Sequence, residues 1–90
     1  MVKLTDDAAL MIEHMVENGQ LPPGAGLRIA QRDDHPALAM RLADGAEPED
    51  VTVTGRQARL FLAPVAEARL VGQTLDARSN EAGSAFFVRP

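Results

Sequence analysis

The residues best suited to chemistry stand together at Asp33-Asp34-His35, between two segments of alternating polarity. Two carboxylates and an imidazole are ligands that a metal ion such as iron accepts. The same residues followed by Pro36 are also typical of an exposed turn, because Asp and Pro favour turn conformations. We favour the turn, and keep Asp33, Asp34 and His35 as secondary candidates for metal ligands.

The other polar residues form no catalytic pattern. His14 has no second ligand in helical register, and Ser79 and Ser84 lack both a Gly-x-Ser-x-Gly context and an evident base. The acidic stretch Glu47–Asp50 is predicted to be a solvated loop, since its spacing marks no acid–base pair. We therefore predict a protein that is not an enzyme and holds no cofactor.

Composition excludes several functions. The chain has no cysteine, which excludes disulfides, thiolate nucleophiles and all-thiolate zinc or iron–sulfur sites. Its net charge is −4 and its basic residues are dispersed, which disfavours nucleic acid as a partner. No signal peptide or membrane-spanning run is evident, so a cytoplasmic location is expected. Abundant Ala and Arg with a single lysine favour a bacterial source with a GC-rich genome.

A helix is predicted over residues 6–18, capped by Thr5 and ended by a left-handed Gly19. Its apolar residues recur at helical spacing, at Ala8, Met11, Ile12, Met15 and Val16. Leu10 falls outside this stripe and widens it. We expect the apolar stripe to face the core.

After the breaker Leu21–Gly26 the apolar period changes to two, which predicts a hairpin turning at Asp33–Pro36, with Met40 facing the core. Further strands are predicted at Val51–Thr54, Ala58–Leu62, Thr74–Ala77 and Ala85–Val88. A turn over Ser79–Gly83 joins the last two, and a short helix over Val65–Leu70 opens at Pro64. The fold class is α+β, mainly β, in one domain over residues 1–90.

Five landmarks along the chain resemble the HesB/IscA-like family of A-type iron–sulfur carriers. They are Leu4-Thr5-Asp6-Asp7-Ala8-Ala9, Gly26-Leu27-Arg28-Ile29, Pro48-Glu49-Asp50-Val51-Thr52-Val53, Leu70-Val71-Gly72-Gln73-Thr74-Leu75-Asp76 and Gly83-Ser84-Ala85-Phe86. Their order matches the family over nearly the whole chain. The resemblance implies an N-terminal helix followed by a mostly antiparallel β-sandwich with a short inserted helix.

The resemblance also implies where thiols would stand. These carriers have one Cys after the first long strand and a Cys-Gly-Cys before the closing Gly-x-x-Phe, which correspond to about Pro36 and to Asn80 and Ala82 here. A Pro, an Asn and an Ala supply no thiolate for iron. The family's cluster-carrying activity is therefore not transferred to this chain.

Three functions remain as hypotheses. The first is a non-enzymatic structural or protein-interaction domain that binds a protein partner and forms a homodimer, for which the apolar strand Ala85–Val88 is a candidate surface. The alternative is an iron–sulfur assembly accessory that binds iron through non-thiol ligands near Asp33-Asp34-His35. The third, a small-molecule module or enzyme, requires a convergent polar pocket.

Overall fold

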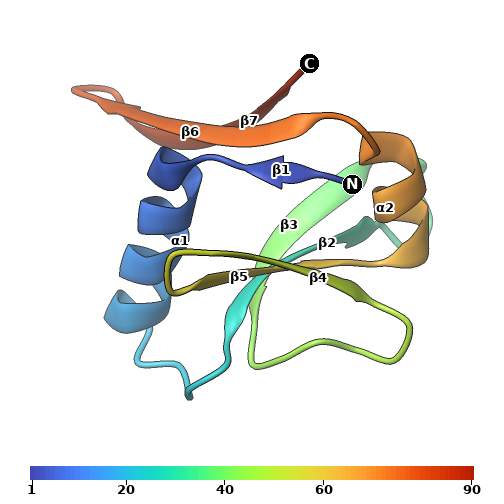
Figure 1. Ribbon diagram of the computed structural model, residues 1–90, viewed down its shortest axis with the longest axis horizontal. Helices are drawn as coiled ribbons and strands as arrows, with labels where there is room; N and C mark the ends of the chain where they lie inside the picture. Colours follow the sequence, from blue (N-terminus) through green and yellow to red (C-terminus); the bar gives the residue numbers. More distant parts are fainter.

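The computed structural model describes residues 1–90 and contains two helices and seven strands (Figure 1). The helices are α1 (Asp6–Asn18) and α2 (Pro64–Leu70). The strands are β1 (Lys3–Leu4), β2 (Gly26–Gln31), β3 (Leu38–Ala43), β4 (Val51–Gly55), β5 (Ala58–Leu62), β6 (Thr74–Asn80) and β7 (Gly83–Arg89). Neither helix is long and apolar enough to cross a bilayer.

The strands form two mixed sheets, which confirms the predicted mainly β class. One sheet has the order β1-β6-β7, with β1 parallel to β6 and β7 antiparallel to it. The other has the order β3-β2-β5-β4, in which the central pair β2–β5 is parallel and both outer pairs are antiparallel. Antiparallel pairing therefore predominates, as expected, but a parallel pair lies in each sheet.

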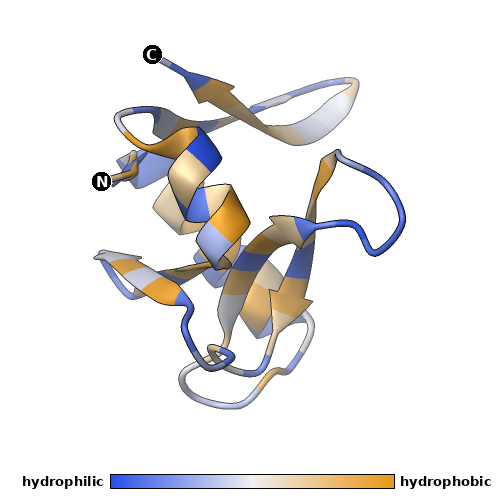
Figure 2. Cartoon of the chain, turned by 90° about the vertical axis from the view of Figure 1, so that its right-hand side faces the viewer, coloured by the Kyte–Doolittle hydropathy of each residue, from blue (hydrophilic) through white to orange (hydrophobic).

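Helix α1 packs against β6 on one side and against β5 and β2 on the other, so it joins the two sheets (Figure 1). In Figure 2 most of the hydrophobic colour lies on the strands and helices, whereas the connecting turns are mostly hydrophilic. Residues from both ends of the chain share one buried cluster. Its members are Val2, Ala8, Ala9, Ile12, Leu27, Ile29, Val53, Ala58, Leu60, Leu62, Ala66, Leu75 and Ala77.

The predicted helix over residues 6–18 is confirmed, as is its cap. The Thr5 Oγ1 accepts a hydrogen bond from the backbone N–H of Ala8 and donates one to Asp76 Oδ1 at 2.7 Å. The expected left-handed stop at Gly19 is wrong, because Gly19 has φ −79° and Gln20 has φ 53°. The backbone N–H of Leu21 reaches the carbonyl of Val16, so the left-handed residue that closes the helix comes one position later.

The remaining elements follow the predictions, with corrections at the edges of the sheets. Strands β2 to β5 and helix α2 lie where expected, but β6 runs three residues and β7 two residues further toward their turn, which shrinks to Glu81 and Ala82. The two-residue strand β1 was not predicted. Met40 is 41% exposed, because it pairs with Ile29 from an edge strand that extends beyond the core, so its predicted core position is wrong.

Candidate functional site

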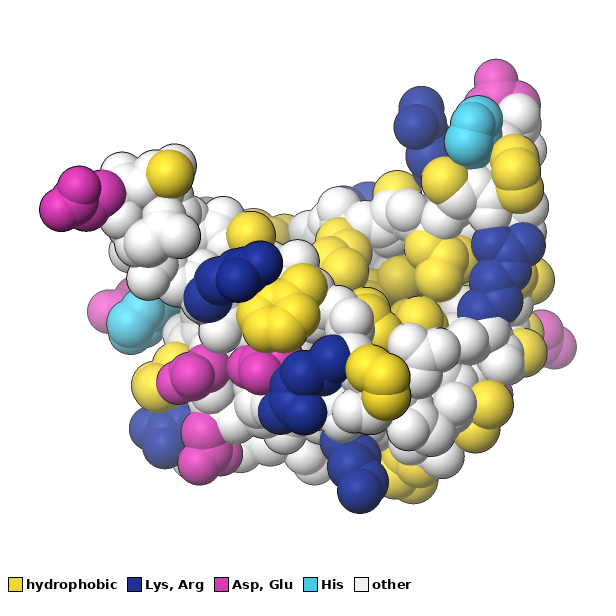
Figure 3. All heavy atoms as spheres, turned by 90° about the horizontal axis from the view of Figure 1, so that it is seen from above, with side chains coloured by type: hydrophobic (Ala, Val, Ile, Leu, Met, Phe, Trp, Pro, Cys, Tyr) yellow, Lys and Arg dark blue, Asp and Glu magenta, His cyan; other side chains and the backbone are white.

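A cleft of about 750 Å³ lies between α1 and the β6–β7 hairpin. It is lined by Asp7, Leu10, Met11, His14, Met15, Asn18, Ala77, Arg78, Ser79, Ser84, Ala85 and Phe86. Figure 3 looks onto a hollowed face between the β6–β7 turn on the left and the β2–β3 turn at the upper right, with hydrophobic side chains inside the hollow. Such an exposed apolar surface is typical of a binding site.

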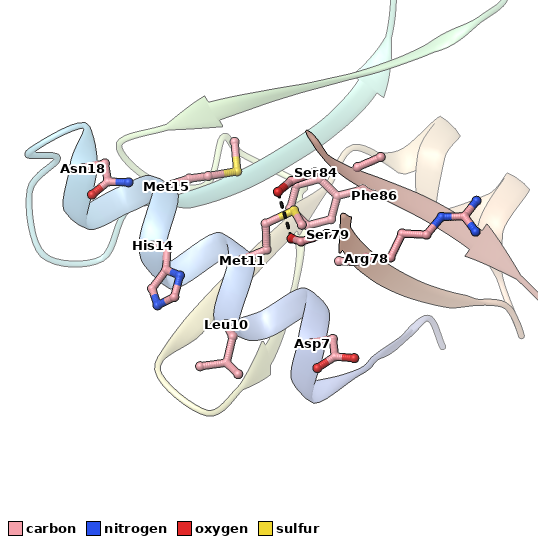
Figure 4. Close-up of a pocket in the computed structure, with 12 residues that line it drawn as sticks. Asp7, Leu10, Met11, His14, Met15, Asn18, Arg78, Ser79, Ser84 and Phe86 are labelled. Carbon is pink, nitrogen blue, oxygen red and sulfur yellow. Dashed lines mark hydrogen bonds between the residues drawn. The ribbon is translucent and has the colours of Figure 1, made fainter. Parts of the chain in front are cut away.

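The polar groups of this cleft do not converge on one point. In Figure 4, Met11 extends toward Ser79, Ser84 and Phe86, whereas His14 extends from the helix in another direction. The two serine Oγ atoms lie 2.8 Å apart and bond to each other, with no imidazole or carboxylate bonded to either. Flexible methionine side chains fit apolar partners of varied shape. The cleft thus offers an adaptable apolar surface and no assembled nucleophile.

Among the sequence patterns, only Leu10, which lies outside the core-facing stripe of α1, hinted at the cleft. Met11 and Met15 were expected to pack in the core, and both are half-buried. Met11 packs against the core cluster and also lines the cleft beside Met15. The cleft itself depends on how far the β6–β7 hairpin stands from the helix, which no local pattern encodes.

The structure places Asp33, Asp34 and His35 in the exposed β2–β3 turn. The His35 Nδ1 accepts a hydrogen bond from the backbone N–H of Ala37 at 3.1 Å, so this nitrogen already serves the turn. Nowhere in the structure do three His, Cys, Asp or Glu side chains form a group that could hold a metal ion.

The positions to which the resemblance assigns thiols lie in two different turns. Pro36 is in the β2–β3 turn, where its carbonyl accepts a hydrogen bond from the Arg69 guanidinium of α2. Asn80 and Ala82 lie together at the β6–β7 turn, where the Ala82 N–H donates to Asn80 Oδ1 at 2.8 Å. The two turns stand at opposite sides of Figure 1. Within one chain, Asn80 and Ala82 therefore lie together, whereas Pro36 lies apart from them.

Arg28 on β2 and Asp50, which directly precedes β4, form an ion pair. The Arg28 Nε and Nη2 donate to the two carboxylate oxygens of Asp50 at 2.9 and 3.0 Å. The side chain of Asp50 is 0% exposed and that of Arg28 is 11% exposed. The prediction of a solvated acidic loop is therefore wrong for Asp50, because a partner twenty-two residues earlier in the chain draws this carboxylate inside.

The same network accounts for the other charges around it. Glu47 lies 3.5 Å from Arg28 and 3.0 Å from Arg41, and its backbone N–H donates to Asp50 at 2.9 Å. The hydrogen bonds from Arg28 hold the pKa of Asp50 below its ordinary value against the opposing effect of burial, and the Glu47 N–H adds to this. These charges satisfy one another, so we interpret the network as structural.

The outer face of the β6–β7 hairpin carries a second set of charges. Asp76 accepts hydrogen bonds from Thr5, from the backbone N–H of Ala77 and from Arg89, and these lower its pKa in that order of importance. The Arg78 guanidinium lies 5.0 Å from the centre of the Phe87 ring. Arg78 on β6 and Arg89 on β7 therefore both lie on the solvent-facing side of the hairpin.

Comparisons with known proteins identify the fold. No family model and no curated protein matches the sequence. Among solved structures, the SufA protein of Escherichia coli, described as involved in the biosynthesis of iron–sulfur clusters, matches with a TM-score of 0.79 and 19% identity over 98% of this chain and 83% of its own. IscA with a [2Fe-2S] cluster matches with a TM-score of 0.70 and 22% identity over 100% of this chain and 83% of its own.

A protein from Aquifex aeolicus matches with a TM-score of 0.75 and 22% identity over 99% of this chain and 90% of its own. These likenesses establish that the chain has the fold of the A-type iron–sulfur carriers, as the sequence landmarks predicted. The sequence has this fold without a single cysteine.

Proposed function

We propose that this chain is a non-enzymatic, single-domain protein with the carrier fold that acts by binding proteins, and that it carries no iron–sulfur cluster. The observation that supports this is the identity of the residues at the thiol positions. Pro36, Asn80 and Ala82 offer no thiolate; Asn80 and Ala82 bond to each other within their turn, and the Pro36 carbonyl accepts a hydrogen bond from Arg69 of α2. The apolar cleft beside α1 supplies a surface for a partner instead.

Anaerobic incubation of the purified chain with ferrous iron and sulfide, followed by gel filtration and metal analysis, tests the proposal. Because cluster assembly needs thiolates, we expect iron and sulfide at background level and no thiolate-to-iron absorption. SufA of Escherichia coli, treated in parallel, serves as the control for the chemistry. Recovery of one cluster for every one or two chains would contradict the proposal.

The alternative function, iron binding through Asp33, Asp34 and His35, has its own test. Titration with ferrous iron in the absence of sulfide, monitored by calorimetry, should give the same negligible heat for wild type and His35→Ala. The reason is that the imidazole caps its turn and the neighbouring carboxylates are exposed. Saturable binding by wild type that His35→Ala weakens about tenfold or more would favour the accessory function instead.

A further inference from the structure

Helix α1 presents apolar side chains on a second side, next to the one that packs in the core. Met11 and Met15 extend from it toward the β6–β7 hairpin, where Phe86 lines the same cleft (Figure 4). Met15 and Leu10 are half-buried, and neither packs against the buried cluster. The stripe of α1 that borders the cleft covers about three turns, or about 16 Å along the helix axis. The cleft is therefore an apolar groove that runs along α1.

The backbone around this groove offers no free hydrogen-bonding groups. On one side it belongs to α1, whose N–H and C=O groups bond within the helix. On the other side it is one face of the β6–β7 ladder, where Ala77 pairs with Phe86 and Ser79 with Ser84, and the two serine hydroxyls bond each other. An extended peptide in this groove would leave its own N–H and C=O groups unpaired, whereas a helix satisfies them internally. The groove therefore suits a helix.

The exposed charges beside the groove are acidic. Asp7 lines it, and Glu17 follows Leu10 by seven residues on the same side of α1. Both carboxylates are exposed, and neither takes part in any of the ion pairs of the chain. The last turn of α1 contains no basic residue, so the negative end of its dipole is not offset. Arg78 also borders the groove, but its guanidinium lies over the Phe87 ring on the other face of the hairpin.

Resting on the proposed protein-interaction function, we infer that this groove binds a basic amphipathic helix of a different protein. Apolar side chains of that helix at positions i, i+3, i+4 and i+7 pack against Met11, Met15 and Phe86. Methionine suits this contact because its flexible thioether adapts to partners of varied shape. Lys or Arg on the flanks of the bound helix meets Asp7, Glu17 and the carboxyl end of α1.

A second copy of this chain does not supply such a helix. Its α1 contains four acidic residues and no lysine or arginine, so two copies of α1 would repel each other. Its α2 has only seven residues and is too short to fill a groove of about three turns. The acidic side of α1 thus favours a partner of opposite charge.

Synthetic peptides test the chemistry of the partner. The probe is a blocked peptide of about 14 residues, with Leu at the four apolar positions and Lys on both flanks. One control peptide has Glu in place of every Lys, and another has the same residues in scrambled order. Calorimetry should show saturable one-to-one binding of the basic peptide and at least about tenfold weaker binding of both controls. Circular dichroism should show that the basic peptide gains helix when it binds.

Met15→Gln tests whether the peptide lies in this groove. The change keeps an unbranched side chain but makes it polar, so peptide binding should weaken about fivefold or more. The melting temperature should stay near that of wild type, because Met15 does not pack against the buried cluster. Val71→Gln, at an exposed apolar residue outside the groove, is the control and should bind the peptide like wild type.

The acidic side chains have their own matched pair of variants. Asp7→Asn combined with Glu17→Gln should weaken binding of the basic peptide about threefold or more and reduce its dependence on salt. Asp33→Asn combined with Asp34→Asn makes the same change in charge in the β2–β3 turn, where both residues are exposed. Binding by this control should match that of wild type.

Three results would overturn the inference: no binding of the basic peptide, equal binding of the acidic or scrambled peptide, or binding that Met15→Gln leaves unchanged. An apolar dye that saturates the groove while no peptide binds would assign the groove to a small molecule instead. These results are independent of cluster assembly. A chain without a cluster that ignores the basic peptide contradicts this inference alone, whereas a chain that assembles a cluster contradicts the proposed function even if the peptide binds.

Discussion

Asp50→Asn is expected to lower the free energy of unfolding by about 3 kcal/mol, because the guanidinium of Arg28, in a site almost closed to water, loses the carboxylate that binds it through two hydrogen bonds and keeps only the more exposed Glu47 at 3.5 Å. A domain of this length has a total stability of only about 5–13 kcal/mol. The loss is therefore a large share of the whole. Urea denaturation followed by circular dichroism near neutral pH measures it.

The same carboxylate gives the effect a pH signature. Its pKa in the folded chain lies below its ordinary value, chiefly because of the hydrogen bonds from Arg28, so its contribution is complete above the unfolded pKa of about 4. The contribution is lost as the pH falls below that value toward the folded pKa. The difference between wild type and Asp50→Asn should therefore shrink below about pH 4.

Asp44→Asn is the matched control, since it makes the same change in charge at an exposed residue with no ion pair. Its effect should stay within about 0.5 kcal/mol at every pH. Equal stabilities for Asp50→Asn and wild type near neutral pH would show that the buried pair does not stabilise this fold.

Gly26→Ala is the second substitution with a large expected effect. A Cβ at residue 26 would lie 2.2 Å from the backbone oxygen of Arg59 and 2.9 Å from its carbonyl carbon. Neither atom can move without shifting β5 away from β2, and these strands pair Leu27 with Leu60 at the centre of the core. We expect a loss of at least about 3 kcal/mol, the upper end of the range for overpacking.

Gly45→Ala provides the comparison for Gly26→Ala. No atom lies within 4 Å of its added Cβ, and its backbone does not require a left-handed conformation. Thermal unfolding should place Gly45→Ala close to wild type and Gly26→Ala many degrees below it. Similar melting temperatures for the two variants would mean that β2 and β5 do not approach as closely as the structure indicates.

The surroundings of Asp50 and of Gly26 show how two of the sequence landmarks stabilise the fold. Gly26 allows the close approach of β2 to β5, and Arg28 pairs with Asp50 across the sheet. At the other end, Thr5 caps α1 and bonds Asp76, which ties the first strand to the sixth. The landmarks therefore serve the fold rather than the chemistry, so a chain without thiols can contain them all.

Local patterns were enough to predict most of the elements. The helical spacing of apolar residues before Gly19 and the alternating polarity on either side of Asp33–Pro36 depend only on residues close together in the sequence. The structure confirms the elements they predicted, α1 and the β2–β3 hairpin. The order of landmarks then predicted the fold. This worked because each landmark marks the beginning or end of an element.

Features set by distant segments were not predictable in this way. The burial of Asp50 depends on Arg28 in another strand, and the exposure of Met40 depends on β3 being at an edge. The candidate cleft arises between α1 and the last hairpin, more than fifty residues apart in the chain. Alternating polarity alone indicates neither which strands lie at the edges nor what covers them.

Placing thiols at these three positions tests most directly whether their absence separates this chain from the carriers that share its fold. Wild type and a variant carrying Pro36→Cys, Asn80→Cys and Ala82→Cys would be reconstituted anaerobically with iron and sulfide, and the bound iron and sulfide counted per chain. We predict that the variant acquires an iron–sulfur cluster that two chains share, because residues 80 and 82 lie together and residue 36 lies in a different turn of the same chain, and that wild type stays at background. Equal iron and sulfide in the two proteins would contradict the account.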